Sequence, residues 1–242
     1  PEDFAQVKVK NARHGLANPN ARYRKAVTAE DVAASPVVAS PLRLLDICAT
    51  SDGGAAVVLA SMDYARRHLA SAEGTGRPLV RVAAISTVTP TFPNTVLELP
   101  NFSTDSAAGL PAPERTFKQA IGDAAYRESG LGPEDVDVAE VYDLSTALEL
   151  DWYEDLGFCG PGEAEKLLRD GVTTLGGRLP VNPSGGLACF GEAVPAQALA
   201  QVCELTWQLR GEATGRQAEG ATVGISANQG LFGHGSSVIL TR

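Results

Sequence analysis

The sequence predicts an α/β fold in which a sheet is flanked by helices in layers. Short runs rich in β-branched residues alternate along the chain with amphipathic segments of helical period. Gly and Pro residues separate these segments at places where helices end and turns form. Hydrophobic residues make up 44% of the 242 residues and charged residues 20%, which suits a protein with a packed core.

The first block of elements is the less regular one. Residues 1–40 are polar and rich in turns, and we expect an irregular, partly helical surface segment there. Within it, Thr28 followed by two acidic residues is typical of a helix N-terminus. The apolar run at 55–60 is bounded by turn residues, which predicts a buried strand. A short helix is expected over 63–68.

A second block begins at Leu79, after a segment of linker composition at 71–78. The β-branched run that starts at Leu79 predicts a strand, and a loop containing Pro, Asn and Ser follows it. Residues 113–130 form an amphipathic pattern that ends in glycines and a proline, which predicts a helix. Residues 136–143 alternate between polar and apolar, which predicts a further strand.

The C-terminal elements are the most regular. A helix is expected directly after Asp143, and a long helix from about residue 193 to 209. Two final strands are expected, and the Gly-rich turn between them contains His234. The resulting alternation of strands and helices predicts the layered α/β class.

The bulk composition excludes several classes of function. The formal net charge of −9 argues against non-specific binding of nucleic acid or of an anionic membrane. No apolar run reaches the length of a membrane span, and the first ten residues contain no apolar signal core. The four cysteines form no C-x-x-C pair and the three histidines are scattered, so we expect no metal site, and reduced thiols in the cytoplasm. Because no initiator Met is present, we expect the chain to begin partway through a longer protein.

Four segments combine reactive side chains with glycines at the ends of predicted strands. They are 142–143, 182–186, 191–192 and 228–235. In layered α/β folds, binding and catalytic groups collect at strand ends and in the loops that follow. We therefore expect these four loops to converge on one site.

The same four loops carry a resemblance to the thiolase superfamily, and most to its sterol-carrier-protein or lipid-transfer-protein branch. The matching stretches are SPLRLLDICATSDGGAAVVLAS, VAEVYDLSTALELDWYEDLGFCGPGEAEKLLRDG, GGRLPVNPSGGL, ALAQVCELTWQLRGEA and ANQGLFGHGSS. The resemblance implies that residues 1–78 are the end of an N-terminal thiolase half with a loop segment. Residues 79–242 would be a C-terminal half, with a mixed five-stranded sheet flanked by helices.

Three catalytic loops depart from the thiolase pattern. Glu192 stands where a thiolase carries its catalytic histidine, and a carboxylate next to a cysteine disfavours the thiolate. Asn228 replaces a second cysteine and cannot transfer protons. The oxyanion-supporting Asn-Glu-Ala-Phe loop is replaced by the loop that begins at Val141 and Tyr142. None of the four cysteines stands in the motif of the thiolase nucleophile.

Some relatives in the lipid-transfer-protein branch are retro-aldolases of steroid side-chain degradation, and the resemblance implies that chemistry here. Retro-aldol cleavage needs a base for the β-hydroxyl, donors for the enolate oxygen and an acid for the α-carbon. Glu192 is the candidate base, and Tyr142 is the candidate group that polarises the hydroxyl or protonates the enolate. Asn228 and His234 are candidate donors. Six further residues are candidates for substrate binding: Asp143, Asn182, Gly186, Cys189, Gly230 and Gly233.

Each candidate also has an ordinary structural interpretation. Glu192 is a favourable carboxylate near a helix N-terminus, and Tyr142 at a strand end is a common core residue. Asp143 is placed to cap the following helix. His234 between two glycines is typical of a surface turn, and Cys189 of a small buried hydrophobe.

Three functions remain open from the sequence. The first is an aldolase that cleaves a β-hydroxyacyl-CoA thioester, with coenzyme A bound as part of the substrate and no separate cofactor. The second is a thiolase, an acyltransferase acting on a β-ketoacyl-CoA, and the third a non-catalytic lipid-binding subunit. The resemblance also implies a homodimer and a partner protein with an OB-fold and zinc ribbon.

Overall fold

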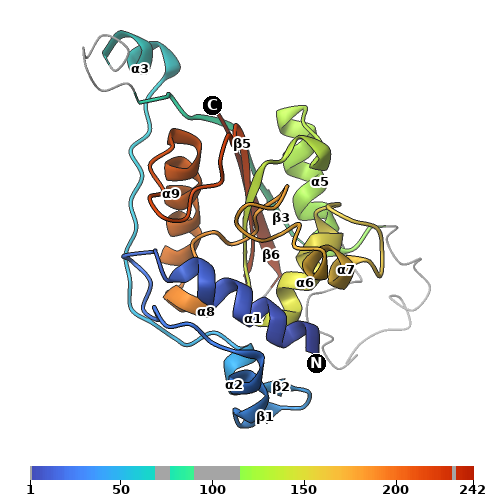
Figure 1. The fold of residues 1–242 in the computed structure, drawn as a ribbon. Helices are drawn as coiled ribbons and strands as arrows, with labels where there is room; N and C mark the ends of the chain where they lie inside the picture. The colour runs from blue at the N-terminus through green and yellow to red at the C-terminus, as the bar shows by residue number, and fades with distance from the viewer. Residues whose placement is uncertain (1, 69–76, 90–114, 231–232) are drawn as a thin grey trace, which may run out of the picture.

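The computed structural model describes residues 2–68, 77–89, 115–230 and 233–242. A central sheet carries helices on both faces, and further helices gather at one edge (Figure 1). The layered α/β class is therefore confirmed. No helix in these ranges is long and apolar enough to cross a membrane.

The central sheet is mixed. Its four strands lie in the order β3 (Arg81–Val88), β6 (His234–Thr241), β5 (Val223–Gly230) and β4 (Val138–Val141). β4 runs parallel to β5, and the other neighbours are antiparallel. The sequence led us to expect five strands; beyond β4 the described chain adds only a single parallel bridge between Ala139 and Val181.

Two long helices cover opposite faces of the sheet (Figure 1). α5 (Phe117–Ser129) packs on β3 and β6, and α9 (Ala196–Arg210) packs on β5 and β4. The side chains of β6 alternate between the two layers: Ile239 belongs to the core on the α5 side and Leu240 to the core on the α9 side. The sheet therefore has a separate hydrophobic core on each face.

The remaining helices surround the C-terminal ends of β4 and β5. They are α1 (Glu2–Gly15), α6 (Thr146–Asp155), α7 (Ala164–Arg169) and the one-turn α8 (Leu187–Phe190). The smaller elements are α2 (Ala29–Ala34), β1 (Val37–Ala39), β2 (Leu42–Arg43), α3 (Met62–His68) and the 3-10 turns η1 (Leu44–Asp46) and η2 (Pro133–Asp135).

The predicted helix ends are explained by capping contacts. The Thr28 hydroxyl accepts a hydrogen bond from the Asp31 amide, and the Asp31 carboxylate accepts one from the Thr28 amide. Thr116 forms the same reciprocal contact at the start of α5, and Gly130 ends that helix in the left-handed conformation. Part of the predicted 113–130 helix and of the 71–78 linker lies outside the described residues.

Two expectations were wrong. Residues 2–15 form the regular helix α1, whose Val7 is fully buried, so this part of the N-terminal segment is not an irregular surface segment. The apolar run at 55–60 is extended and pairs with no strand among the described residues, and Val58 is 98% exposed. A run of apolar residues predicts extended backbone well, but whether it is buried depends on which partner strands are present.

Candidate functional site

Tyr142 follows the last residue of β4. Its backbone N–H donates to the Ala227 carbonyl of β5 at 3.0 Å, which continues the parallel ladder by one residue. Its own carbonyl accepts a hydrogen bond from the Trp152 indole at 3.0 Å. These two contacts fix the backbone of Tyr142 at the C-terminal edge of the sheet.

Glu192 follows α8 and is fixed from both sides by the segment after η1. Its N–H donates to the Ala49 carbonyl at 2.8 Å, and its carbonyl accepts from the Ser51 N–H at 2.9 Å. Gly191 has a φ of +82°, and a Cβ there would lie 2.7 Å from the Ser51 hydroxyl oxygen. Only glycine allows the chain to pass this close to residue 51. Gly191 therefore helps to fix the position of the Glu192 backbone.

The structure brings Tyr142 and Glu192 together, as the convergence of strand ends predicts. The Tyr142 hydroxyl donates a hydrogen bond to the Glu192 carboxylate. Burial raises the pKa of Tyr142 above its ordinary value, and the hydrogen bond to Glu192 raises it further. The phenol therefore keeps its proton at neutral pH and donates it in a hydrogen bond to the carboxylate.

A free thiol lies in the electrostatic field of this pair. Cys48 is half-buried, and its N–H donates to the Leu144 carbonyl at 3.0 Å. Burial raises the pKa of Cys48 to about 12, with further contributions from Glu192 and Asp143. A protonated thiol is a poor nucleophile, so Cys48 is not poised for acyl transfer.

Asp143 is turned away from the Tyr142 hydroxyl and towards α8. Its carboxylate accepts the N–H groups of Leu187 at 2.7 Å and Ala188 at 3.3 Å, and the Asn11 side-chain amide at 3.0 Å. Burial raises the pKa of Asp143 to about 8, and the neighbouring Glu149 acts in the same direction. Asp143 thus caps a helix, but that helix is α8; α6 is capped by Ser145.

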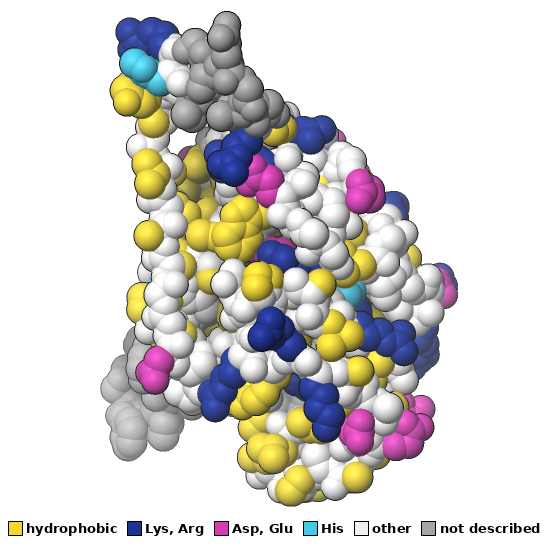
Figure 2. All heavy atoms as spheres, turned by 60° about the vertical axis from the view of Figure 1, so that its left-hand side comes forward, with side chains coloured by type: hydrophobic (Ala, Val, Ile, Leu, Met, Phe, Trp, Pro, Cys, Tyr) yellow, Lys and Arg dark blue, Asp and Glu magenta, His cyan; other side chains and the backbone are white. Residues whose placement is uncertain are grey.

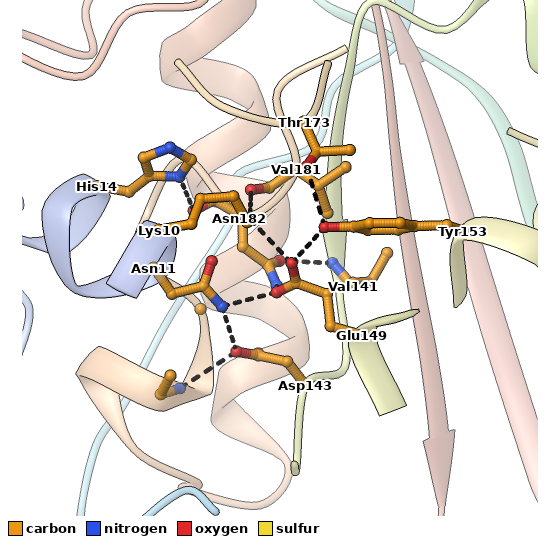
Figure 3. A network of polar contacts seen from close by, with 12 residues as sticks. Lys10, Asn11, His14, Val141, Asp143, Glu149, Tyr153, Thr173, Val181 and Asn182 are labelled. Carbon is orange, nitrogen blue, oxygen red and sulfur yellow. Dashed lines mark hydrogen bonds and ion pairs between the residues drawn. The ribbon is translucent and has the colours of Figure 1, made fainter. Parts of the chain in front are cut away.

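A buried polar network continues from Asp143 to α1 (Figure 3). Glu149 of α6 is fully buried and lies 2.8 Å from the Lys10 ammonium. The same carboxylate accepts hydrogen bonds from Asn11 at 2.6 Å, Asn182 at 2.7 Å and the Tyr153 hydroxyl at 2.6 Å. None of Lys10, Asn11 and Glu149 was predicted as a site residue; Lys10 and Asn11 lie in the N-terminal segment, which was expected on the surface.

Asn182 and His14 complete this network on the strand side. The Asn182 side-chain oxygen accepts the Val141 N–H at 2.8 Å, and Asn182 has a φ of +53°, which few residues other than glycine adopt. His14 Nε2 accepts the Leu175 N–H at 3.0 Å, so its Nδ1 carries the proton and donates to the Asn182 carbonyl. Burial lowers the pKa of His14 to about 3, with Lys10 adding to the effect. The contacts of Asn182 are therefore with buried residues of the chain itself, and its predicted contact with substrate stays a prediction.

Gly186 and Cys189 also lie in this packed region. Gly186 has a φ of +61°, and a Cβ there would approach the Asp143 carboxylate to 2.4 Å. The Cys189 thiol is 1% exposed and contacts the Asn11 carbonyl at 3.3 Å. Both residues serve the contact between α8, α1 and Asp143, and their predicted contact with substrate stays a prediction.

The remaining candidates lie along the hairpin of β5 and β6. The Asn228 side-chain amide donates to Gln201 of α9 at 2.7 Å, which leaves its buried oxygen without a partner among the described residues. His234 is exposed and pairs with Gly230, where a Cβ would meet the imidazole at 2.3 Å. Within the described ranges no hydrogen bond joins His234 to Tyr142 or Glu192. Gly233 takes the turn before His234 with a φ of +93°.

A groove opens beside the Glu192 loop, between the extended segment after Thr50 and helix α9. Its volume is about 540 Å³, and Ser51, Gly191 and Ala193 belong to its lining. Figure 2 shows the hollow between this extended segment and the body of the molecule, with hydrophobic side chains along it. The groove thus reaches the loop that carries Glu192, while its lining includes neither Tyr142 nor Glu192.

Metal ligation has no evident place in the part of the chain that the structure describes. Those residues contain no group of three or more His, Cys, Asp or Glu side chains arranged to hold an ion. The arrangement at Tyr142 and Glu192 is instead suited to moving a proton between a phenol and a carboxylate.

Comparisons with known proteins agree with this fold. The family described as "Thiolase C-terminal domain-like" matches residues 109–242. "Sterol carrier protein 2" of Oryctolagus cuniculus is 37% identical over 232 residues, which cover 96% of this chain and 40% of that protein. An "Acetyl-CoA acetyltransferase" of Methanothermobacter thermautotrophicus is 39% identical over 237 residues, covering 98% of this chain and 57% of that protein.

Two further relatives carry lyase or aldolase names. The "17-hydroxy-3-oxo-4-pregnene-20-carboxyl-CoA lyase" of Mycobacterium tuberculosis is 36% identical over 230 residues, covering 95% of this chain and 55% of that protein. The solved structure "Ltp2-ChsH2(DUF35) aldolase" superposes with a TM-score of 0.76 and 28% identity, covering 99% of this chain and 58% of that one. The chain therefore spans between 40% and 58% of the length of these four relatives.

Proposed function

The chain belongs to the thiolase C-terminal domain-like family. From this premise we propose that it is part of a lyase that cleaves a β-hydroxyacyl-CoA by a retro-aldol reaction. The observation that carries the proposal is the hydrogen bond from the Tyr142 hydroxyl to the Glu192 carboxylate. A steroid side chain is the proposed acyl group, because a relative 36% identical is named as a pregnene carboxyl-CoA lyase.

The Tyr142–Glu192 pair can act as a proton relay. As the β-hydroxyl proton of the substrate moves to the Tyr142 oxygen, the phenolic proton moves to Glu192. The electron pair of the O–H bond forms the new carbonyl, and the pair of the Cα–Cβ bond becomes the enolate of the thioester. Return of a proton from the relay to the α-carbon gives the shortened acyl-CoA, so the enzyme ends in its starting state.

The developing enolate oxygen needs donors. We propose Asn228, the backbone N–H groups of residues 230 and 233–235, and His234 for this role. The side-chain amides of Gln201 and Asn228 face each other. If both amides rotate by half a turn, the Gln201 nitrogen donates to the Asn228 oxygen, and the Asn228 nitrogen becomes available to donate to a ligand. The donor role of Asn228 thus requires no movement of the backbone.

Thiolytic acyl transfer is the second candidate, because an acetyl-CoA acetyltransferase is 39% identical. That reaction needs a thiolate close to a base. Near Glu192, the described chain offers Cys48, whose pKa is raised by burial and by Glu192 itself. Cys48 therefore does not supply this thiolate, and the acyltransferase requires a nucleophilic cysteine from outside the present chain.

We extend the proposal to a partner subunit of OB-fold and zinc-ribbon type, since the similar aldolase is named as a complex of Ltp2 with a DUF35 protein. Homodimer formation is proposed as well. The assay for function therefore includes the protein with and without such a partner.

The proposal is tested by offering β-hydroxyacyl-CoA and β-ketoacyl-CoA substrates to the same preparation. Release of a ketone or aldehyde together with a shortened acyl-CoA from the first, without thiolysis of the second, is the expected result. CoA-dependent cleavage of the second alone would indicate the acyltransferase. Binding of both without turnover of either would indicate a lipid-binding subunit.

A further inference from the structure

Tyr142 and Glu192 come from elements that are far apart in the chain. A contact between these elements must therefore hold the two side chains in position. Tyr142 lies at the end of β4, and Glu192 follows the one-turn helix α8. The hydrogen bond between them spans 50 positions of sequence. A shift of about 1 Å between reacting groups can cost on the order of 100-fold in rate. Whatever fixes α8 relative to the end of β4 therefore sets the geometry of the pair.

Asp143 provides a contact between the end of β4 and helix α8. Its backbone directly follows Tyr142, while its carboxylate accepts the N–H groups of Leu187 and Ala188 at the start of α8. The residue is 2% exposed, so water does not compete for these hydrogen bonds. The absence of a side chain at Gly186 lets α8 approach the carboxylate this closely.

We propose that Asp143 is a positioning residue for the reaction, which holds α8, and with it Glu192, in register with Tyr142. The inference rests on the proposed function for its catalytic consequence. It replaces the expectation that Asp143 contacts substrate. The support behind Asp143 comes from α1, because Asn11 donates to both Asp143 and Glu149 (Figure 3).

Both side-chain oxygens of Asp143, and not only its shape, are required. Both carboxylate oxygens accept: one takes the Leu187 N–H, and the other takes the Ala188 N–H and the Asn11 amide. An asparagine of the same shape has one oxygen and one NH₂ group. In either orientation its NH₂ group faces an N–H donor, so the start of α8 loses part of its anchor.

Asp137 provides a matched control at the opposite end of β4. Its carboxylate accepts the backbone N–H groups of Thr222 at 2.8 Å and Val223 at 3.0 Å. One oxygen of Asp137 takes both N–H groups, and the amide oxygen of an asparagine can replace it, so Asp137→Asn makes the same substitution beside the same strand, away from the proposed site, without loss of an acceptor. Its kcat is expected to stay within about twofold of the unchanged protein.

The test uses ¹⁹F NMR of the full chain labelled with fluorotyrosine, together with steady-state kinetics. The chain has five tyrosines, and the Tyr142 resonance is the one lost in Tyr142→Phe. Glu192→Gln gives the resonance position of a phenol without its carboxylate partner. In Asp143→Asn the Tyr142 resonance is expected to move towards that position, while Asp137→Asn leaves it in place. The kcat of Asp143→Asn is expected to fall about 10- to 100-fold with KM changed less than about threefold.

An unmoved Tyr142 resonance in folded Asp143→Asn would overturn the inference, whatever the enzyme's activity. A moved resonance with no turnover in any protein would uphold the positioning role and remove the proposed function. If Asp143→Asn does not fold, Asn11→Ala removes one donor to the same carboxylate. A smaller shift in the same direction is expected there, and no shift would contradict the inference.

Discussion

Replacing Lys10 by Met should destabilise the protein strongly, because Lys10 is the cation of the buried network behind the site. Its side chain is 3% exposed, and its ammonium lies 2.8 Å from Glu149 and donates to the Val181 carbonyl at 2.8 Å. Removing one partner of a buried ion pair costs about 3–5 kcal/mol, since the other charge stays buried. Glu149 keeps three hydrogen-bond donors after the change, so we expect a loss of about 3–4 kcal/mol in the free energy of unfolding.

The assay is urea unfolding followed by tryptophan fluorescence, with Lys166→Met as the control; of the two tryptophans, Trp152 is fully buried. Lys166 forms an ion pair of similar length, 2.6 Å to Asp170, but its side chain is 74% exposed. The control should leave the free energy of unfolding nearly unchanged, since exposed pairs contribute little. A Lys10→Met cost within about 1 kcal/mol of the control would refute the reasoning that the network is a buried, charge-balanced unit.

Two other substitutions test the same region. Gly186→Ala should lower the free energy of unfolding by at least about 2 kcal/mol, because the added Cβ meets the Asp143 carboxylate at a φ of +61°. The control Gly162→Ala, with a φ of +77° and open space around it, should lower it by only about 1 kcal/mol. Equal losses for the two variants in urea melts would contradict this reasoning. For His14, whose pKa burial lowers to about 3, the unfolded chain binds a proton near pH 6.5 that the folded chain does not bind. His14 should therefore contribute a fall of about 1.4 kcal/mol in stability per unit as pH drops from 6.5 towards 3. Because the raised pKa of Asp143 contributes in the opposite direction, the His14 contribution is measured as the difference between the unchanged protein and His14→Gln in a pH series of urea melts, and the exposed His68→Gln should show no such difference.

The regular elements of the C-terminal part could be predicted because local signals define them. The Thr116 capping box, the left-handed Gly130 and the apolar periodicity between them place α5 without any tertiary information. The strand ends that carry Tyr142 and Asn228 follow from alternation in the same way. The contact of Tyr142 with Glu192 was expected from the convergence of loops at the edge of an α/β sheet.

The buried network could not be predicted, because its residues are of types that normally face water. Lys10, Asn11 and His14 share one side of α1, and such a polar face is typical of a solvated surface. They are buried only because Glu149 and Asn182, far away in the sequence, supply opposite charge and hydrogen bonds. Long-range pairing of this kind leaves no periodic signal in a single sequence.

The segment at 55–60 differs from the expectation in the opposite direction, because apolar residues expected in the core are exposed. Its composition predicts a buried strand, yet Val58 is almost fully exposed and no described strand pairs with it. In this run the expected extended backbone is present, whereas burial depends on neighbours that lie elsewhere in the chain.

Deuterium incorporation tests the central claim most directly, because retro-aldol cleavage must reprotonate the α-carbon of the released acyl-CoA. Turnover of a β-hydroxyacyl-CoA in D₂O should place one deuterium at that carbon in each product molecule. Tyr142→Phe and Glu192→Gln should each slow product formation about 10²- to 10⁴-fold, the range of one general acid–base group. Product that forms without deuterium, or at unchanged rates in both variants, would contradict the assignment of the Tyr142–Glu192 pair as the proton relay.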